Sequence, residues 1–337
     1  MRTIVIGLLA LLIVMTMRAD DAVKIHGFID AYYAWNSSHP ASHENFEAGT
    51  GSTARRANEF DLNLAEVDIT RDAKTVGFHL SLIAGNGADV IHASEPQGYR
   101  FVYQASILYK RSDRLTFEAG IYPSHIGFEG FFSKDNWSYT RGWLAEFSPY
   151  YQTGISANYA FSSHWSGELH VLNGWQNIAD NNDAKAIGGK IAYAKGRLTA
   201  SLNTFDGPEL ADDDKQWRHF GDLIATFTAT PRLSIGGSID RGRQEAANWV
   251  GVAAYGRYAF DERRAVAVRA ERFSDPQNGI SGTPQKLAEA TLTFEYRPAP
   301  NLILKVEGRR DHSTAPAFNG SSSRDETIVV IGAVATF

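Results

Sequence analysis

One feature of this sequence limits its possible folds more than any other. Apolar and polar residues alternate along nearly the whole chain. The stretch EATLTFEY at residues 289–296, for example, places Ala, Leu, Phe and Tyr at even positions and Glu and Thr at odd ones. A period of two is typical of a β-strand whose two faces meet different surroundings. About sixteen such runs follow residue 24, and one phase slip, near Ala65, predicts a β-bulge. The sequence therefore predicts an all-β chain of about sixteen strands.

The connections between these runs alternate in length. The short ones are 72–75, 111–114, 162–164, 195–197, 228–232, 261–263 and 298–301. The longer ones are 37–58, 86–100, 122–150, 174–185, 207–216, 241–248, 274–286 and 312–324. Short turns on one rim and long loops on the other are typical of a single transmembrane antiparallel β-barrel. An even strand count then places both chain ends on the rim with the short turns.

The aromatic residues help to separate a membrane barrel from the alternative, a soluble β-sandwich whose apolar core is shared by two sheets. Many of them stand at the ends of the runs, where a membrane barrel carries its interfacial girdles. They are Tyr33, Trp35, Tyr109, Tyr159, Phe161, Trp165, Tyr193, Tyr258, Phe260, Tyr296 and Phe337. Their positions favour the membrane barrel.

The N-terminus predicts export. Arg2 is followed by an apolar run from Ile4 to Met15, which has the length of a signal peptide and is short for a membrane span. We expect residues 1–22 to be a cleaved signal peptide and 23–337 to be the barrel. No later run reaches the ~18 apolar residues of a membrane helix. The sequence has no cysteine, so disulfides are excluded, and its net charge of −5 argues against a nucleic-acid partner.

The segment 122–150 interrupts the alternation with a mixture of aromatic and charged residues. Long irregular segments between strands are usually functional or disordered, and this one is too aromatic for disorder. We expect it to be the third extracellular loop, folded into the barrel so that it narrows the channel. The alternative is an ordinary packed surface loop.

Three stretches, in this order and spacing, carry a resemblance to a known family: GFIDAYYAWN (27–36), NWSYTRGWLAEFSPYYQTGI (136–155), and LNGWQN (172–177) followed by DNNDAKAIGG (180–189). The chain resembles the OmpL-like β-barrel porins of Gram-negative bacteria. The resemblance implies a channel in the outer membrane, in contact with outer-membrane lipid and lipopolysaccharide, and it suggests a homotrimer. The terminal Phe337 is similar to the signal that the outer-membrane assembly machinery reads.

Charges on the predicted inward faces are the candidate site. Four cations, Arg257, Arg269, Lys305 and Arg309, lie on neighbouring late strands and predict a basic wall. The segment 122–150 carries Glu129, Lys134, Asp135, Arg141 and Glu146. Its carboxylates, Glu129, Asp135 and Glu146, could face the wall across a narrow opening and create a transverse field that orders polar solutes.

In that arrangement Arg269 and Arg309 are the residues that we expect to control ion selectivity, with Arg141 in addition if its loop turns inward. The alternative is that the wall cations are solvated and paired with carboxylates of their own wall. Those carboxylates are Glu271, Glu289, Glu307 and Asp311.

Other motifs are weak. Asp180 to Asp183 resemble a fragment of a calcium loop but lack its later ligands, and turn formation explains them. Neither HExxH nor GxSxG is present, although His170 could serve as a base in a site assembled from separate strands.

We therefore expect no enzyme, cofactor or metal. The leading hypothesis is a water-filled channel for passive diffusion of small polar solutes and ions. The alternatives are a substrate-selective porin with an internal binding track, and an outer-membrane hydrolase or adhesin on a closed barrel.

Overall fold

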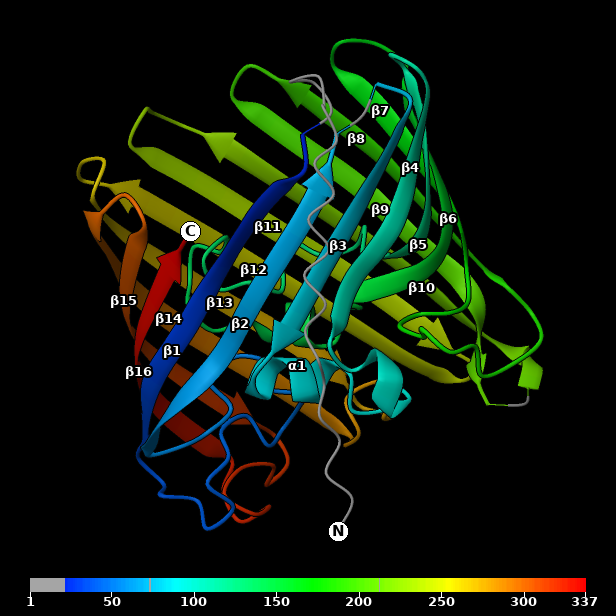
Figure 1. Ribbon diagram of the computed structural model, residues 1–337. Helices are drawn as coiled ribbons and strands as arrows, with labels where there is room; N and C mark the ends of the chain where they lie inside the picture. The colour runs from blue at the N-terminus through cyan, green and yellow to red at the C-terminus, as the bar shows by residue number, and fades with distance from the viewer. Residues whose placement is uncertain (1–21, 73, 212) are drawn as a thin grey trace, which may run out of the picture.

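The alternating runs form sixteen antiparallel strands that close into one barrel (Figure 1). This computed structural model describes residues 22–72, 74–211 and 213–337, so the expected signal peptide lies outside the described residues except for residue 22. The all-β membrane barrel is confirmed, including its strand count. Among the described residues no helix is long and apolar enough to cross a bilayer.

The strands are β1 (Lys24–Asn36), β2 (Glu59–Arg71), β3 (Val76–Ala84), β4 (Val102–Ser112), β5 (Leu115–Pro123), β6 (Tyr151–Ala160), β7 (Trp165–Leu172), β8 (Ala186–Lys195), β9 (Leu198–Leu210), β10 (Asp213–Thr228), β11 (Leu233–Gln244), β12 (Ala247–Ala259), β13 (Arg264–Asp275), β14 (Gln285–Ala299), β15 (Leu302–Ser313) and β16 (Asp325–Thr336). The connections hold the short helices α1 (Asn86–Ile91), η2 (Gln97–Tyr99) and α2 (Trp143–Glu146).

The two faces of each strand behave as a membrane barrel requires. On β14 the inward Glu289 and Thr293 are 4% and 0% exposed, whereas the outward Leu292 and Phe294 are 56% and 43% exposed. Apolar side chains thus cover the outside and polar side chains lie within, which is the reverse of a soluble sandwich. Lipid takes the place of water around the outer face.

The barrel closes between β1 and β16, and the terminal residue completes this seam. The amide of Gly27 donates to the carbonyl oxygen of Phe337 at 3.2 Å, and the amide of Phe337 donates back to Gly27 at 3.0 Å. The aromatic ring of Phe337 lies directly over Gly27, where an added Cβ would come within 2.4 Å of the ring. A larger residue at position 27 would therefore clash with the terminal ring and with the carbonyl oxygen of Glu66, which would also lie 2.4 Å from the added Cβ.

The register between β1 and β2 shifts at Asp30 and Ala31, whose partners are Leu64 and Leu62. Asn63 is the additional residue, so the predicted bulge exists but lies two positions before Ala65. The Nδ2 atom of Asn63 donates to the carboxylate of Asp30 at 2.8 Å. The bulge therefore points an amide into the barrel.

Two predicted long connections, 207–216 and 241–248, are wrong. Strand β9 continues to Leu210 before β10 begins at Asp213, and β11 continues to Gln244 before β12 begins at Ala247. The residues at these strand ends are mostly polar or charged, so the apolar half of the alternation disappears there. The other predicted connections agree with the strand ends to within two residues.

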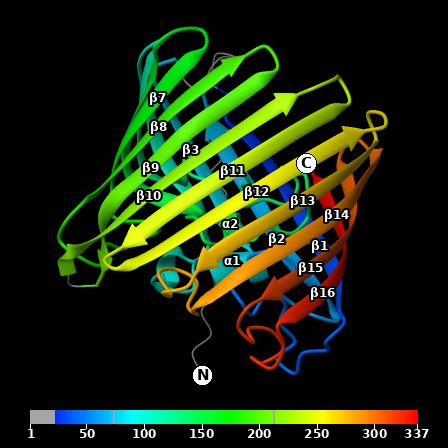
Figure 2. The ribbon, with the colours of Figure 1, turned by 180° about the vertical axis from the view of Figure 1, so that it is seen from behind.

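Strand length divides the barrel into two sides. Strands β3–β8 have 8 to 11 residues, whereas β9–β16 have 12 to 16. Figure 2 shows the long strands β10–β15 crossing the barrel side by side. The charges of the candidate site lie mostly on this long-stranded side.

Candidate functional site

The inward face of β13, β14 and β15 carries its charges in rows. Arg269, Thr291 and Arg309 are direct cross-strand neighbours in one row. The adjacent row holds Glu271, Glu289 and Asp311, and continues to Glu326 on β16. Because directly opposite residues on one face interact, each cation row can be neutralised by the carboxylate row beside it. The first row has two cations and the second has four carboxylates, so the wall is not simply basic.

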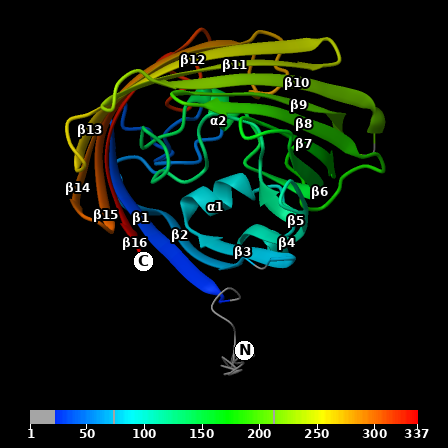
Figure 3. The same ribbon diagram turned by 90° about the horizontal axis from the view of Figure 1, so that it is seen from above.

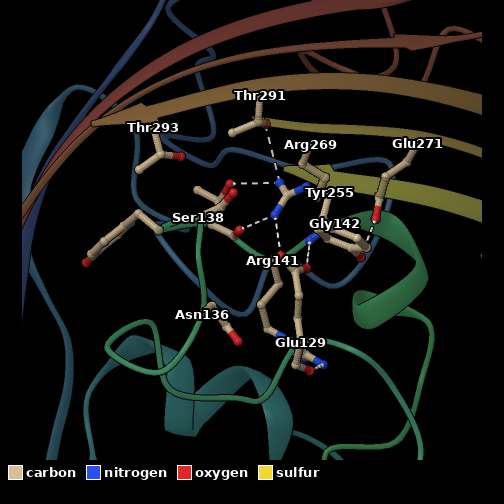
Figure 4. Close-up of polar contacts among 12 residues, drawn as sticks. Glu129, Asn136, Ser138, Arg141, Gly142, Tyr255, Arg269, Glu271, Thr291 and Thr293 are labelled. Atoms are coloured by element: carbon tan, nitrogen blue, oxygen red, sulfur yellow. Dashed lines mark hydrogen bonds and ion pairs between the residues drawn. The ribbon is translucent and has the colours of Figure 1, made fainter. Parts of the chain in front are cut away.

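Arg269 joins this wall to the segment 124–150, which is the part of the predicted segment 122–150 that lies between β5 and β6 (Figure 4). Its Nη1 lies 2.7 Å from the Oε1 atom of Glu129, and its Nε lies 2.9 Å from the Oε2 atom of Glu289. The Nη1 group also donates to the carbonyl oxygen of Thr140 at 2.6 Å. The Arg269 side chain has 0% exposure. One guanidinium thus connects two carboxylates and a backbone carbonyl in a dry site.

Lys305 binds the same segment through its backbone. Its ammonium group donates to the carbonyl oxygens of Ser133, Asn136 and Ser138 at 2.7, 2.6 and 3.2 Å. The nearest carboxylate is that of Glu295 at 3.8 Å. The three donors of a lysine match the three carbonyls, which holds this part of the loop in one conformation.

Arg309 makes a bidentate pair with Asp311, with both distances 2.8 Å. It also donates to the carbonyl oxygen of Arg141 at 2.6 Å. Its guanidinium lies 4.9 Å from the ring of Trp143 and 4.6 Å from the ring of Phe46. Arg309 therefore packs between aromatic groups instead of facing an open path.

Carboxylates of the barrel wall accept backbone amides of the segment in turn. Glu307 accepts from the amides of Tyr139 and Thr140. Glu271 accepts from the amide of Trp143, and Asp222 on β10 accepts from Gly127 at 2.8 Å. The segment is thus held from Gly127 to Trp143. In Figure 3, seen along the barrel, α2 and the chain beside it lie within the ring of strands.

Aromatic packing and one buried hydroxyl complete the contact. Phe128 stacks on Tyr255 of β12 with ring centroids 4.0 Å apart. The Tyr139 hydroxyl donates to Asp30 on β1 at 2.7 Å. Burial, and then the Asp30 carboxylate, raise the pKa of Tyr139 well above its usual range, so the hydroxyl keeps its proton for this bond.

The other predicted residues lie at different places. Lys134 and Asp135 pair with each other at 2.8 Å, with the Asp135 side chain 60% exposed. Glu146 accepts from the hydroxyls of Ser52 and Tyr150 at 2.7 and 2.8 Å.

Arg141 is buried, and its guanidinium lies 4.2 Å from the Tyr150 ring. Arg257 is half-buried and pairs with Glu295 at 3.1 Å.

Two parts of the expectation differ from this geometry. Glu129 does not face Arg269 across an opening but contacts it directly. Arg269, Lys305 and Arg309 are at most 2% exposed, so they do not stand free in water. The alternative pairing within the wall describes Arg269 with Glu289 and Arg309 with Asp311, but these groups are buried rather than solvated. The physical reason is that the segment supplies the hydrogen bonds that water would otherwise make.

The opposite wall, formed by β2–β8, carries polar groups that sequence reasoning did not select. Four of its charged or titratable side chains keep part of their exposure: Asp68 19%, His79 32%, Glu168 21% and Lys190 26%. Glu118 on β5 is also half-buried. Their position on the polar face of alternating strands was the available signal. Nothing in the sequence distinguished this exposed wall from the buried one.

A histidine pair lies where the segment meets this side. The ring of His125 stacks on that of His170 on β7 at 4.2 Å. The Nδ1 and Nε2 atoms of His125 lie 2.7 Å from the Oε1 atom of Gln152 and 3.0 Å from the carbonyl oxygen of Thr204. Burial, and then the neighbouring His170, lower the pKa of His125 to about 4. His170 is the direct cross-strand neighbour of Ser156 on β6, and its ring nitrogens lie 3.4 Å from the Tyr122 hydroxyl and 3.3 Å from the Glu168 carboxylate.

A cavity of about 730 Å³ opens among the long loops. Its lining includes Glu146, Glu209, Arg218, Trp175 and Gln176. Within the described ranges no group of three or more His, Asp or Glu residues could hold a metal ion.

A closed sixteen-stranded barrel with an apolar outside and a charged inside is the architecture of an outer-membrane porin. The chain belongs to the family described as "Putative beta-barrel porin-2, OmpL-like", whose model matches residues 22–337. The predicted resemblance is thus confirmed, and with it an outer-membrane porin channel. None of the functionally curated proteins compared with the chain matched it.

Three solved porin-like structures show the same fold. The anion-selective porin from Comamonas acidovorans has a TM-score of 0.61 at 12% identity, covering 94% of this chain and 100% of that one. OmpF of Salmonella typhi, in complex with daunomycin, has a TM-score of 0.61 at 12% identity, with 96% and 100% coverage. OmpT of Vibrio cholerae has a TM-score of 0.60 at 11% identity, with 96% and 99% coverage. At such identities the likeness concerns the fold alone.

Proposed function

We propose that this porin is a passive, water-filled channel for small hydrophilic solutes and ions, narrowed by the segment 124–150. The observation that carries the proposal is the set of buried contacts between this segment and the inward charges of β13 and β15. A loop on the outer surface of the barrel could not reach Arg269, Lys305 and Glu307 together.

The solute path in this proposal follows the β2–β8 wall. Inward charges there such as Asp68, Glu168 and Lys190 are 19–26% exposed, whereas those of β13–β15 are sealed beneath the segment. Hydrated solutes need groups that water can also reach, because a fully paired buried charge has no free donor or acceptor to offer.

Replacing residues 128–145 by a short Gly-Ser link tests this function. The expected result is a higher single-channel conductance in planar bilayers, because the link cannot fill the space that the aromatic segment occupies. The matched control places the same link in the short turn 261–263, on the opposite rim, and should leave conductance unchanged. An unaltered conductance after the 128–145 replacement would refute a constriction at this segment.

A substrate-selective porin is the second candidate, and the 730 Å³ cavity among the loops favours it. Arg218 in its lining lies 3.8 Å from Glu209 and 5.1 Å from the Trp175 ring. A solute with hydroxyl and charged groups would find both donors and acceptors there. Saturating flux, or current block by one solute of a panel, would select this candidate over free diffusion.

Two further proposals concern the partners of this porin, and one measurement separates the remaining alternatives. We propose a homotrimer, in keeping with the resemblance to porins, and light scattering of the purified protein in detergent tests it through the protein mass per particle. Phe337 is proposed as the signal for the assembly machinery, and its deletion should lower the yield in the membrane. A hydrolase or adhesin on a closed barrel would give no single-channel current at all.

A further inference from the structure

The 730 Å³ cavity among the long loops is lined by a cation whose hydrogen-bond donors are only partly used. Arg218 points inward from β10, and its Nε and Nη2 groups both donate to the Oε1 atom of Gln244, at 3.1 and 2.7 Å. Its third nitrogen, Nη1, makes no hydrogen bond with any described residue and lies 3.8 Å from the Oε2 atom of Glu209. The Arg218 side chain is 13% exposed. A guanidinium group with an unused donor thus borders the cavity.

Aromatic packing holds this guanidinium group in place. It lies 5.1 Å from the ring centroid of Trp175 and 5.8 Å from that of Trp249. The Trp175 ring in turn makes T-shaped contacts with Phe205 and Phe220, with ring centroids 5.0 and 4.9 Å apart. Contacts with aromatic rings and with a neutral amide fix the position of a cation without neutralising it. Arg218 is therefore preorganised to receive an anion.

The buried cations of the β13–β15 wall differ from Arg218. Arg269 and Arg309 lie 2.9 and 2.8 Å from carboxylates, and the Lys305 ammonium group donates to three backbone carbonyls. These cations hold the segment 124–150 in place. In the described part of the chain, no hydrogen bond or ion pair joins Arg218 to that segment. Arg218 therefore needs a different explanation.

The other charges around the cavity favour an anion with a single negative charge. Glu47, Glu146 and Glu209 are also part of the lining. Because Coulomb repulsion grows with the charge of the ligand, these three carboxylates repel a doubly charged phosphate more strongly than a carboxylate. A carboxylate can still accept a charge-assisted hydrogen bond from Arg218. The charge balance thus favours a carboxylate ligand.

The remaining lining is rich in neutral polar groups. Ser94, Asn278 and Thr283 line the cavity with side chains that make no hydrogen bond within the described ranges. Such hydroxyl and amide groups can both donate to and accept from the hydroxyl groups of a sugar. The volume also lies within the ~300–1,000 Å³ that is usual for small-molecule sites. The cavity can therefore hold a polyhydroxylated solute that carries a carboxylate.

We propose that this cavity is a capture site for sugar acids. Arg218 binds the carboxylate of a uronic acid unit, and groups such as Asn278 and Thr283 bind its hydroxyls. This inference rests on the proposed channel and names the solute class of its substrate-selective form. Glu146 and Phe147 of the segment 124–150 also line the cavity, so a captured solute lies beside the proposed constriction. Capture there raises the local concentration of the solute at the entrance to its path.

Isothermal titration calorimetry of the full barrel in detergent tests this proposal, with digalacturonate, two linked uronic acid units, as the probe. The parent protein should bind digalacturonate, and Arg218→Gln should weaken binding roughly 10- to 100-fold, because it removes a charge-assisted hydrogen bond. The matched control is Arg241→Gln, which removes an exposed arginine from the outward face of the neighbouring strand β11 and should bind as the parent does. No binding by the parent, or equal binding by Arg218→Gln and Arg241→Gln, overturns the proposal.

Two other probes identify the chemistry that is recognised. The dimethyl ester of digalacturonate keeps the hydroxyls without the charge, so it should bind the parent as weakly as digalacturonate binds Arg218→Gln. Equal binding of the acid and the ester would contradict the role of Arg218. Sodium acetate should compete only at a much higher concentration, because it has no hydroxyl groups. Competition at the concentration of digalacturonate itself would make the cavity a general anion site and refute the sugar-acid assignment.

A second variant keeps the test decisive if Arg218→Gln does not assemble, which migration of the unheated protein in gel electrophoresis reveals. Asn278→Ala with Thr283→Ala changes two loop side chains that have no hydrogen-bond partner to lose, and it should weaken digalacturonate binding several-fold. Unchanged binding by this double variant would contradict the proposed site.

The outcome for this site is separate from the outcome for the channel, because calorimetry does not depend on conduction. A barrel that conducts but does not bind digalacturonate refutes the capture site alone. A barrel that binds digalacturonate but does not conduct refutes the proposed channel alone.

Discussion

The inward faces of β13–β15 and of β2–β8 come from strands with the same alternating pattern, yet they end in opposite states. On β13–β15 the charges of Arg269, Lys305 and Arg309 are buried and bonded to the segment 124–150. On β2–β8 charges such as Asp68 and Lys190 keep about a fifth to a quarter of their exposure. The difference teaches that the strand pattern decides which residues point inward, and the loop decides which of these meet water.

The contrast has an energetic consequence. A buried ion pair is costly to break because the remaining partner keeps a charge away from water, whereas a half-exposed pair is screened and contributes little. The two walls should therefore respond very differently to the removal of one cation.

The largest expected effect is on stability. Arg269→Met leaves Glu129 and Glu289 buried without their counter-ion and should reduce the free energy of unfolding by about 3–5 kcal/mol. Lys190→Met on the other wall, which breaks a 3.4 Å pair with Glu168, should cost about 1 kcal/mol or less. Urea unfolding of the barrel in lipid vesicles measures both.

A second change sharpens this comparison. Adding Glu289→Gln to Arg269→Met should recover part of the loss, because it removes one uncompensated charge. Similar losses of unfolding free energy for Arg269→Met and Lys190→Met would show that the two walls are equally accessible to water. That result would contradict the comparison.

The next effect is a dependence of the unfolding free energy on pH. It arises where the segment 124–150 contacts strands β6–β9. The pKa of His125 is lowered to about 4, below its usual value of about 6.5, so the folded state prefers the neutral ring. This contribution to stability is complete above about pH 6.5 and is lost as the pH falls through about 4. Protonation in place would cost roughly 3 kcal/mol.

Unfolding free energies at pH 7.5 and pH 4.5 test this dependence. His125→Gln should show a smaller loss between the two than the parent protein, whereas the exposed His39→Gln should behave as the parent does. If His125→Gln loses as much unfolding free energy between pH 7.5 and pH 4.5 as the parent protein does, other groups cause the effect.

The smallest expected effect is on ion selectivity, which reports which wall faces the path. The half-exposed Glu118 and Glu168 should attract cations, since only charges within a Debye length of about 8 Å act on a passing ion at ~0.15 M salt. Glu118→Gln with Glu168→Gln should move the reversal potential toward anions, more so at low salt. Glu262→Gln, in a short turn, is the control.

The same recording separates the two walls. Arg269 and Arg309 were expected to control selectivity, but both are only 2% exposed. Glu168 is also paired, with Lys190 at 3.4 Å, but it keeps 21% exposure. Arg269→Gln with Arg309→Gln should therefore change the reversal potential less than the exchange at Glu118 and Glu168, provided the variant still assembles. A larger change for the arginine pair would restore the basic wall as the selective element.

The sequence predicted the barrel well because a strand's period is local. Each alternating run records which face meets lipid, and a run such as 289–296 needs no knowledge of its partner. The prediction failed at 207–216 and 241–248, where the strand ends are mostly polar or charged and lose the apolar half of their pattern. The bulge was displaced by two residues because a phase slip does not say which residue is unpaired.

The lumen was much less predictable. Arg269 and Glu129 were both selected from the sequence, but as groups facing each other across an opening, whereas they are in contact over 140 positions of chain. Lys305 was selected as a pore cation, but its ammonium group binds three backbone carbonyls. Every residue has a backbone carbonyl, so residue types could not predict these contacts. Contacts with backbone atoms leave no mark in the side-chain pattern.

By itself the sequence determined sixteen strands, their inward and outward faces and the one segment that breaks the pattern, because these follow from the two-residue repeat and from the girdle of aromatic residues. Only the tertiary structure decided which inward charges are buried and which stay exposed to solvent. That outcome depends on where the segment 124–150 packs, and its packing depends on contacts between residues far apart in the chain, which a local period cannot encode.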